Sequence, residues 1–70
     1  MKNGIGKTLR TLRQAAGLTQ KQLGDALFVS ARTIGDWESD HTEPSIFMIK
    51  KLITFFNITY EELLDSENIG

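Results

Sequence analysis

The amino-acid sequence predicts an all-α fold, a compact bundle of five helices in one small domain. Apolar residues recur every three or four positions in successive segments, which is typical of helices with one buried face. Thr19, Ser30 and Thr59 each stand just before such a segment, where a hydroxyl can cap the first free backbone amides. The expected helices are joined by short connections, as in antiparallel helical packing.

Length and composition narrow the possibilities further. Seventy residues are near the lower limit for a single core, and without cysteine the chain has no disulfide and no thiolate metal site. His41 cannot build a histidine zinc site by itself, and we expect it in a surface loop. No apolar run approaches the ~20 residues that span a bilayer, and the sequence shows no signal peptide with a charged segment before an apolar one. We therefore expect a soluble cytoplasmic protein.

The net charge of −1 hides an asymmetry along the chain. Residues 1–13 contain four cationic side chains and no acid, whereas residues 36–43 contain four acids and no Lys or Arg. The basic residues lie mostly off the apolar stripe of the first helix, so we expect them to be solvated. A basic amino end can attract phosphate, but the chain lacks the high isoelectric point of a strong general DNA binder.

The first two helices have clear boundaries. The apolar stripe of the first consists of Ile5, Leu9, Leu12 and Ala16. Gly17 is its expected stop, because glycine adopts the left-handed conformation without a Cβ penalty. The second helix begins after Thr19, where Gln22 completes a capping box. We expect Leu23, Ala26 and Leu27 to face inward and Gly24 to permit the close approach of a neighbouring helix.

The remaining three helices follow the same logic. Ser30 caps the third helix, whose buried face is Ile34 and Trp37. Pro44-Ser45 opens the fourth helix, which is expected to run to about Asn57. Its expected core face consists of Ile46, Ile49, Leu52, Ile53 and Phe56. Thr59 and Glu62 form a second capping box before a short fifth helix. We expect one domain over residues 1–66 and a frayed polar tail over 67–70.

The spacing from Thr19 to Glu38 resembles the helix-turn-helix of the phage-repressor and Cro type, often called the XRE family. The matching residues are Leu18-Thr19-Gln20, Leu23, Leu27, Val29-Ser30, Thr33-Ile34, Trp37-Glu38, Pro44-Ser45 and Glu61-Glu62-Leu63-Leu64. Each match alone is weak, but together, at fixed spacing over residues 5–65, they are a strong signal. The resemblance implies the five-helix bundle of a phage-repressor DNA-binding domain, with the helix-turn-helix in its second and third helices.

The resemblance implies that the third helix enters the major groove of DNA and contacts base edges. The candidate base contacts on its outward face are Ala31, Arg32, Thr33 and Asp36. Arg32 either pairs with guanine O6 and N7 or is an ordinary solvated side chain bonded to Asp36. Asp36 can accept from a cytosine amino group or orient Arg32. Ala31 can meet a thymine methyl group, and Thr33 can reach a phosphate or a base.

The resemblance also gives candidate phosphate contacts. Gln20 is the residue that typically binds phosphate at the start of the second helix in this family, and free amides at a helix start favour an anion there. Lys21, the Ser30 hydroxyl and Thr42 are additional candidates. Lys7 and Arg10 either reach the flanking DNA backbone or serve as solubilising charge.

Three residues depart from the family pattern. Phe28 stands where glycine usually makes the corner between the two helices, and a non-glycine residue at positive φ costs ~1 kcal/mol or more. Either the turn differs, or the Phe28 ring packs usefully. Asp40 replaces the glycine after the third helix, a milder change because Asp tolerates the left-handed region. Glu43 stands where a basic residue is common, and with Asp36 and Asp40 it lowers the positive potential at the expected DNA face.

The fourth helix carries two aromatic residues with two interpretations. Phe47 and Phe55 lie on either side of Lys51. They are either partly buried in the core or, together with Ile58 and Tyr60, part of an apolar patch for self-association. A two-fold dimer would present two third helices about one DNA turn apart.

Taken together, these features predict a sequence-specific DNA-binding transcriptional regulator, a repressor that binds a palindromic operator as a homodimer. The alternative is a protein-binding module of the same fold, antitoxin-like or anti-repressor-like, in which acidic substitutions have weakened DNA contact. We expect no cofactor, no metal and no enzymatic activity, because the sequence has no nucleophile–histidine arrangement, glycine-rich phosphate loop or metal-ligand cluster.

Overall fold

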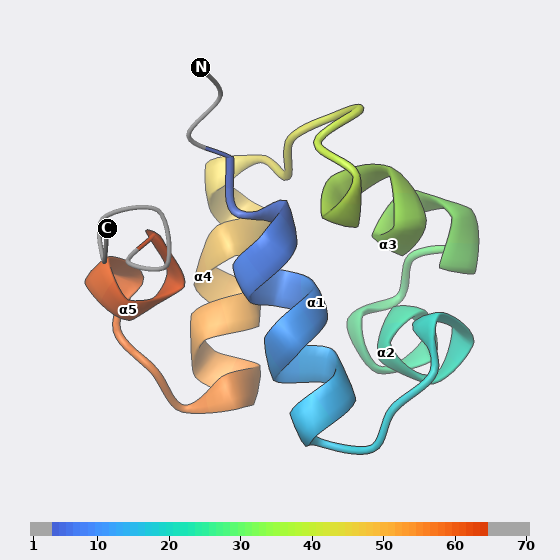
Figure 1. Ribbon diagram of the computed structural model, residues 1–70, viewed down its shortest axis with the longest axis horizontal. Helices are drawn as coiled ribbons and strands as arrows, with labels where there is room; N and C mark the ends of the chain where they lie inside the picture. The colour runs from blue at the N-terminus through green and yellow to red at the C-terminus, as the bar shows by residue number, and fades with distance from the viewer. Residues whose placement is uncertain (1–3, 65–70) are drawn as a thin grey trace.

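The computed structural model describes residues 4–64, which form five helices without a strand, as predicted. The helices are α1 (Gly6–Ala15), α2 (Gln20–Leu27), α3 (Ala31–Glu38), α4 (Ile46–Phe56) and α5 (Tyr60–Leu64). In Figure 1, α1 crosses the middle of the bundle, with α4 and α5 on its left and α2 and α3 on its right. The predicted domain end at residue 66 and the frayed tail over 67–70 lie outside the described residues.

The predicted helix starts are confirmed by their caps. The Gln22 backbone N–H donates to the Thr19 hydroxyl at 3.0 Å, and the Thr19 N–H donates to the Gln22 side-chain oxygen at 2.9 Å. Thr59 and Glu62 repeat this capping box at 3.0 and 2.8 Å. The Ser30 and Ser45 hydroxyls accept from the third backbone N–H of α3 and α4. Local sequence therefore determines where four of the five helices begin.

A single apolar core joins all five helices. Its buried residues are Ile5, Leu9, Leu23, Leu27, Ile34, Trp37, Leu52 and Leu63. Three residues predicted to face inward are exposed instead. Ala16 follows the last residue of α1, Ala26 lies at the rim of a groove between α2 and α4, and Ile46 is the first residue of α4. Helical spacing places these residues near the buried side, but at these three positions no neighbouring element covers them.

Left-handed residues end the helices and turn the chain. Gly17 has φ +73°, which confirms it as the stop of α1, and Asp40 has φ 61°, the conformation that aspartate tolerates. Asp40 also accepts a hydrogen bond from the Gly6 N–H at 3.2 Å. Its carboxylate therefore helps to fix the start of α1 against the loop after α3. This departure from the family pattern has a structural use.

Phe28 keeps the conformation of the glycine that it replaces. Its φ and ψ of 64° and 38° are left-handed, so the turn does not differ, and the residue is 86% exposed, so its ring does not pack in the core. The ring contacts Lys51, whose Nζ lies 5.3 Å from the ring centroid. An exposed cation–π contact contributes ~0.5–1 kcal/mol, which is comparable with the cost of the strained backbone.

We expect Phe28→Gly to be more stable than Phe28→Ala by about 1 kcal/mol. Both variants lose the exposed ring and its contact with Lys51, but only glycine also removes the Cβ from the left-handed backbone. Urea denaturation followed by circular dichroism measures both free energies of unfolding. Equal stability of the two variants would show that Phe28 stores no backbone strain.

Candidate nucleic-acid interface

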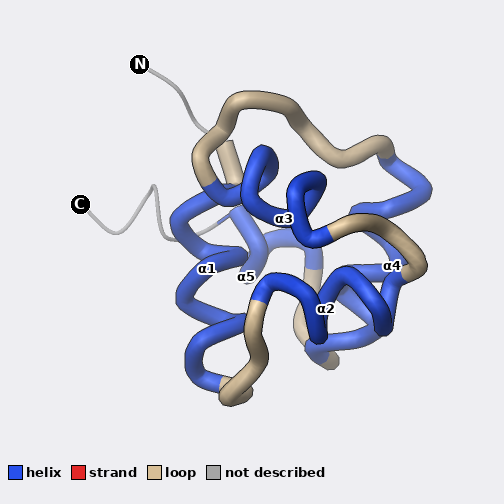
Figure 2. The backbone as a smooth tube through the Cα atoms, turned by 90° about the vertical axis from the view of Figure 1, so that its right-hand side faces the viewer, coloured by secondary structure: helices blue, strands red, loops and turns tan. Residues whose placement is uncertain are grey.

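The two helices predicted to form the helix-turn-helix lie side by side on one face of the bundle. Figure 2 looks onto this face, with α2 and α3 in front of α1, α4 and α5. Residues 28–30 form the corner between them. A Cβ on Gly24 would lie 2.6 Å from the Val29 carbonyl oxygen, so Gly24 allows this corner to fold back on α2. The close approach predicted at Gly24 is therefore made by the corner backbone, not by another helix.

The inward face of α3 is as predicted. Ile34 and Trp37 are buried in the core and hold the helix on the bundle. On the other side, Arg32 is exposed, while Ala31, Thr33 and Asp36 are half-buried. Ser30, the N-cap, places these residues in the first turns of the helix, the part that helix-turn-helix proteins present to base edges.

Arg32 and Asp36 do not pair with each other. Within residues 4–64 the ion pairs are Arg10–Glu38, Arg13–Glu38 and Lys21–Asp25, so the alternative of Arg32 bonded to Asp36 is wrong. The helix carries Arg ahead of Asp, the poorer order for such a pair. The Arg32 guanidinium therefore extends into solvent with its donors available to an acceptor.

The loop after α3 is tied to the end of that helix. The Asp36 backbone carbonyl accepts from the His41 N–H at 2.9 Å and from the Thr42 N–H at 3.3 Å. Both side chains are exposed, which confirms His41 as a surface residue. The bond to the Thr42 N–H places Thr42 beside the C-terminal end of α3, where its hydroxyl is accessible.

The other candidate phosphate contacts have partners within the chain. Lys21 Nζ lies 3.1 Å from Asp25 Oδ2 in an exposed pair, which is worth only a few tenths of a kcal/mol, roughly 0.3–0.5, on a helix. The Ser30 hydroxyl accepts from the Thr33 N–H and lies 3.0 Å from the Thr33 hydroxyl. Lys21 and Ser30 nevertheless remain exposed, so their contacts within the chain leave both side chains accessible to a phosphate.

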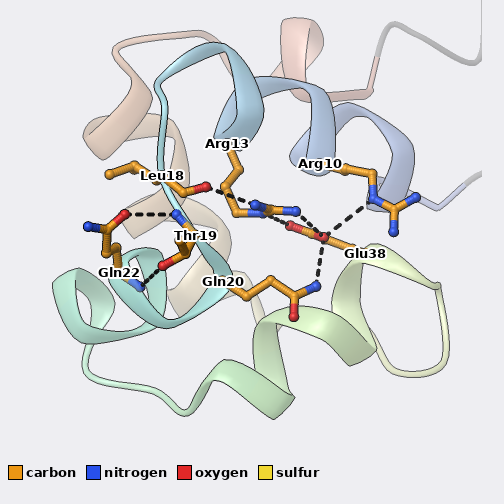
Figure 3. Close-up of polar contacts among 7 residues, drawn as sticks. All are labelled: Arg10, Arg13, Leu18, Thr19, Gln20, Gln22 and Glu38. Carbon is orange, nitrogen blue, oxygen red and sulfur yellow. Dashed lines mark hydrogen bonds and ion pairs between the residues drawn. The ribbon is translucent and has the colours of Figure 1, made fainter.

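Gln20 is not simply a surface side chain. Its Nε2 donates to Glu38 Oε1 at 3.1 Å, so the amide bridges the start of α2 and the end of α3. Figure 3 shows Gln20 pointing toward Glu38, with its oxygen turned away from that contact. The bridge fixes the orientation of Gln20 from within the fold.

Glu38 is the centre of a buried polar cluster that the sequence did not predict. Its side chain is 2% exposed and accepts hydrogen bonds from Arg13 Nε at 2.5 Å and Arg13 Nη2 at 3.1 Å. Arg13 Nη1 also donates to the Leu18 carbonyl oxygen at 2.8 Å, and Arg10 Nε lies 3.7 Å from Glu38. These contacts join α1, the connection after it, α2 and α3 (Figure 3).

This cluster corrects one expectation. The Arg13 side chain is only 11% exposed, so it is not one of the solvated cations, and its partner Glu38 is buried with it. Hydrogen bonding to Glu38 raises the pKa of the Arg13 guanidinium, assisted by the negative charge of Glu38 and opposed by burial. A signal was present in the sequence. Ile34, Trp37 and Glu38 follow the i, i+3, i+4 spacing of a buried face, and an acid there needs a cationic partner.

Two further features concern metal and membrane. Among residues 4–64, no three His, Cys, Asp or Glu side chains are placed to hold a metal ion together. In the same part of the chain, none of the helices has the length and apolar character needed to cross a bilayer.

Comparison with known proteins agrees with this geometry. A family model described as "Helix-turn-helix" matches residues 9–63, which include all of α2, α3 and α4. The chain belongs to this helix-turn-helix family. The resemblance to phage repressors noted in the sequence is confirmed.

The relatives of this helix-turn-helix chain are regulators. It is 39% identical over 65 residues to the HTH-type transcriptional activator BcrR of Enterococcus faecalis, covering 93% of this chain and 32% of that protein. It is 29% identical over 66 residues to the HTH-type transcriptional regulator ImmR of Bacillus subtilis, covering 94% of this chain and 52% of that protein. The chain thus spans about a third of the length of the first of these curated relatives and about half of the second.

A solved structure has the same fold. The P22 c2 repressor protein, in complex with a synthetic operator in the presence of Tl⁺, matches with a TM-score of 0.80 and 28% sequence identity. The match covers 87% of this chain and 92% of that chain. The five-helix bundle of the phage-repressor type is therefore confirmed.

Proposed function

We propose that this chain is a sequence-specific DNA-binding unit of a transcriptional regulator, a repressor, which inserts α3 in the major groove. The observation that carries this proposal is the outward face of α3. Arg32 is exposed and unpaired with Asp36, at the start of a helix held from behind by Ile34 and Trp37. The likeness to a repressor solved in complex with an operator supports the same conclusion.

Each residue of this face has a proposed role. Arg32 donates to guanine O6 and N7, and Asp36 accepts from a cytosine amino group. Ala31 meets a thymine methyl group, and the Thr33 side chain contacts a base or phosphate at the entrance to the groove. Because Asp36 repels phosphate, the surface discriminates between sequences more than it attracts DNA in general.

The proposed phosphate contacts surround the start of α2. Gln20 presents its amide, held in place by Glu38, beside the amide-rich helix terminus that favours an anion. Lys21, Ser30 and Thr42 contact the neighbouring phosphates with their exposed polar groups.

The proposed regulator works without a cofactor or metal, carries out no enzymatic reaction and acts in the cytoplasm. Two copies bind as a homodimer to a palindromic double-stranded operator, because a two-fold dimer would reach half-sites about one DNA turn apart.

Selection of bound sequences from a random double-stranded DNA pool tests the proposal. We expect enrichment of a palindrome whose half-sites contain guanine opposite Arg32. A palindrome would support both the dimer and the reading of bases. Failure to enrich any sequence would favour the alternative of a protein-binding module with the same fold.

Arg32→Ala is expected to cost ~1–3 kcal/mol of discrimination at one base pair of each half-site. The affinity for DNA in which that base pair has been replaced should fall much less than the affinity for the selected operator. Lys21→Ala serves as the matched control, because loss of a phosphate contact weakens binding about equally for all sequences. Fluorescence anisotropy with both sets of DNA measures the two effects. Uniform weakening by Arg32→Ala would contradict its role in reading bases.

A modest salt dependence is expected for operator binding. The logarithm of the affinity falls with the logarithm of salt by ~0.9 per phosphate neutralised, and this face carries few cations. Titration of the operator complex from low to high salt measures the slope. A slope steeper than about eight would indicate a broad electrostatic interface and would contradict selective binding through α3.

A further inference from the structure

Three phenylalanines outside the proposed DNA contacts are exposed. Phe28 at the corner, and Phe47 and Phe55 on α4, have exposed rings, and Phe47 is 66% exposed. Lys51 Nζ lies 5.3 Å from the Phe28 ring centroid and 5.5 Å from that of Phe47, between the two rings. Of the two interpretations of Phe47, partial burial in the core is therefore wrong.

Phe47, Lys51 and Phe55 line a groove between α2 and α4. The groove has a volume of about 390 Å³, and its lining consists of Ala26, Leu27, Phe47, Lys50, Lys51, Thr54 and Phe55. Among the described residues, the groove is lined by no Asp or Glu and by none of the residues proposed to contact DNA. The groove is thus apolar on its floor and positive at its edge.

The predicted self-association patch is divided in the structure. Tyr60 does not line this groove but a second, smaller hollow that it shares with Pro44 and Ile49. A two-fold dimer through the α2–α4 groove would bring the same patch of both copies together. Lys50 and Lys51 of one copy would then face those of the other with no acid in the groove to offset them, so charge disfavours a second copy as the occupant.

The position of Lys51 also disfavours stacked nucleic-acid bases. Bases stack on free ring faces. The Lys51 ammonium lies over the faces of Phe28 and Phe47, where a base would have to displace it. A carboxylate would instead approach this ammonium directly, while apolar side chains next to it covered the two rings, Ala26 at the rim and Leu27 on the floor.

We propose that the α2–α4 groove is a docking site for a helix of a protein partner, with an apolar stripe flanked by Asp or Glu. The apolar stripe packs on Phe47, Phe55 and Leu27, and the acids pair with Lys50 and Lys51. Recognition of an amphipathic helix in an apolar groove needs anchors at i, i+3 or i+4 and i+7. This proposal goes beyond DNA binding and does not depend on it, since the two surfaces share no residue.

Selection from a displayed library of helical peptides tests the proposal. The library carries about 16 randomised residues, or about four helical turns, and is selected on the intact 70-residue chain. We expect the enriched peptides to combine an apolar stripe with Asp or Glu beside it. Their affinity should fall at least ~10-fold for Phe47→Glu and for Lys51→Gln, as for central residues of an interface.

Ile46→Glu is the matched control for Phe47→Glu. Ile46 is the neighbouring residue, is 65% exposed, receives the same charge and does not line the groove. Peptide affinity should stay within about twofold, since residues outside the contact contribute little. Circular dichroism checks that every variant keeps its helices.

Several results would overturn the proposal. One is that no peptide is enriched, or that the enriched peptides lack acids and bind Lys51→Gln as well as the original chain. Another is that Phe47→Glu lowers the sedimentation coefficient of the chain alone, which would identify a second copy as the occupant. Binding of an oligothymidylate that is lost in Phe47→Glu would identify single-stranded nucleic acid instead.

Discussion

We expect Arg13→Ala to lower the free energy of unfolding by about 3–5 kcal/mol, because it removes the buried cation that is hydrogen-bonded to the Glu38 carboxylate. Glu38 is 2% exposed and takes two of its hydrogen bonds from Arg13. Such a loss is a large fraction of the stability of a domain of 70 residues. Urea denaturation followed by the fluorescence of Trp37, the single tryptophan, measures it.

Arg10→Ala is the control for this prediction. Arg10 also faces Glu38, but its Nε lies 3.7 Å away and its side chain is 60% exposed, so we expect a loss of at most about 1 kcal/mol. The double variant Arg13→Met with Glu38→Leu should recover most of the stability lost by Arg13→Ala, because it removes both buried charges. Equal losses of stability for Arg10→Ala and Arg13→Ala would show that the burial of the Arg13–Glu38 pair does not determine how much unfolding free energy is lost.

We expect Gly24→Ala to lower the free energy of unfolding by about 1–3 kcal/mol, although alanine is the better helix former. The new methyl group would lie 2.6 Å from the Val29 carbonyl oxygen and 3.1 Å from the Ser30 carbonyl carbon. Both atoms belong to the corner backbone, which can yield only by moving the start of α3. We therefore expect operator affinity to fall as well, in anisotropy measurements at a temperature where the variant is folded.

Gly35→Ala is the matched control on the other helix of the motif. A Cβ there meets only side-chain atoms of Gln20, at 3.5 Å or more, which is ordinary contact. Alanine in place of glycine inside a helix should raise stability by about 0.5–1 kcal/mol. If both alanine variants changed stability in the same direction, the close approach of the corner backbone would not explain why position 24 needs glycine.

Local signals in the sequence were sufficient for much of the fold. The capping boxes of Thr19 and Thr59 and the cap at Ser30 involve residues three positions apart, so their geometry can be inferred from the chain itself. The buried pair Ile34 and Trp37 follows from helical spacing for the same reason.

Contacts between distant segments could not be inferred in that way. Arg13 and Glu38 are 25 positions apart, and only the packing of α1 against α3 brings them together. Ala26 and Ile46 have core-like spacing, yet their exposure depends on where neighbouring helices end. Of the candidate site, the outward position of Arg32 was predictable, whereas the bridge from Gln20 to Glu38 was not.

The cluster around Glu38 has a consequence for motion. One carboxylate receives hydrogen bonds from α1 and from α2 while belonging to the last turn of α3. A local opening that released α3 would carry Glu38 away from Arg13 and Gln20 and break all these bonds at once. Amide hydrogens of α3 should therefore exchange with solvent at rates set by opening of the whole domain, not by fraying of one short helix. The helix that we propose to enter the DNA major groove is thus a rigid surface before any DNA is bound.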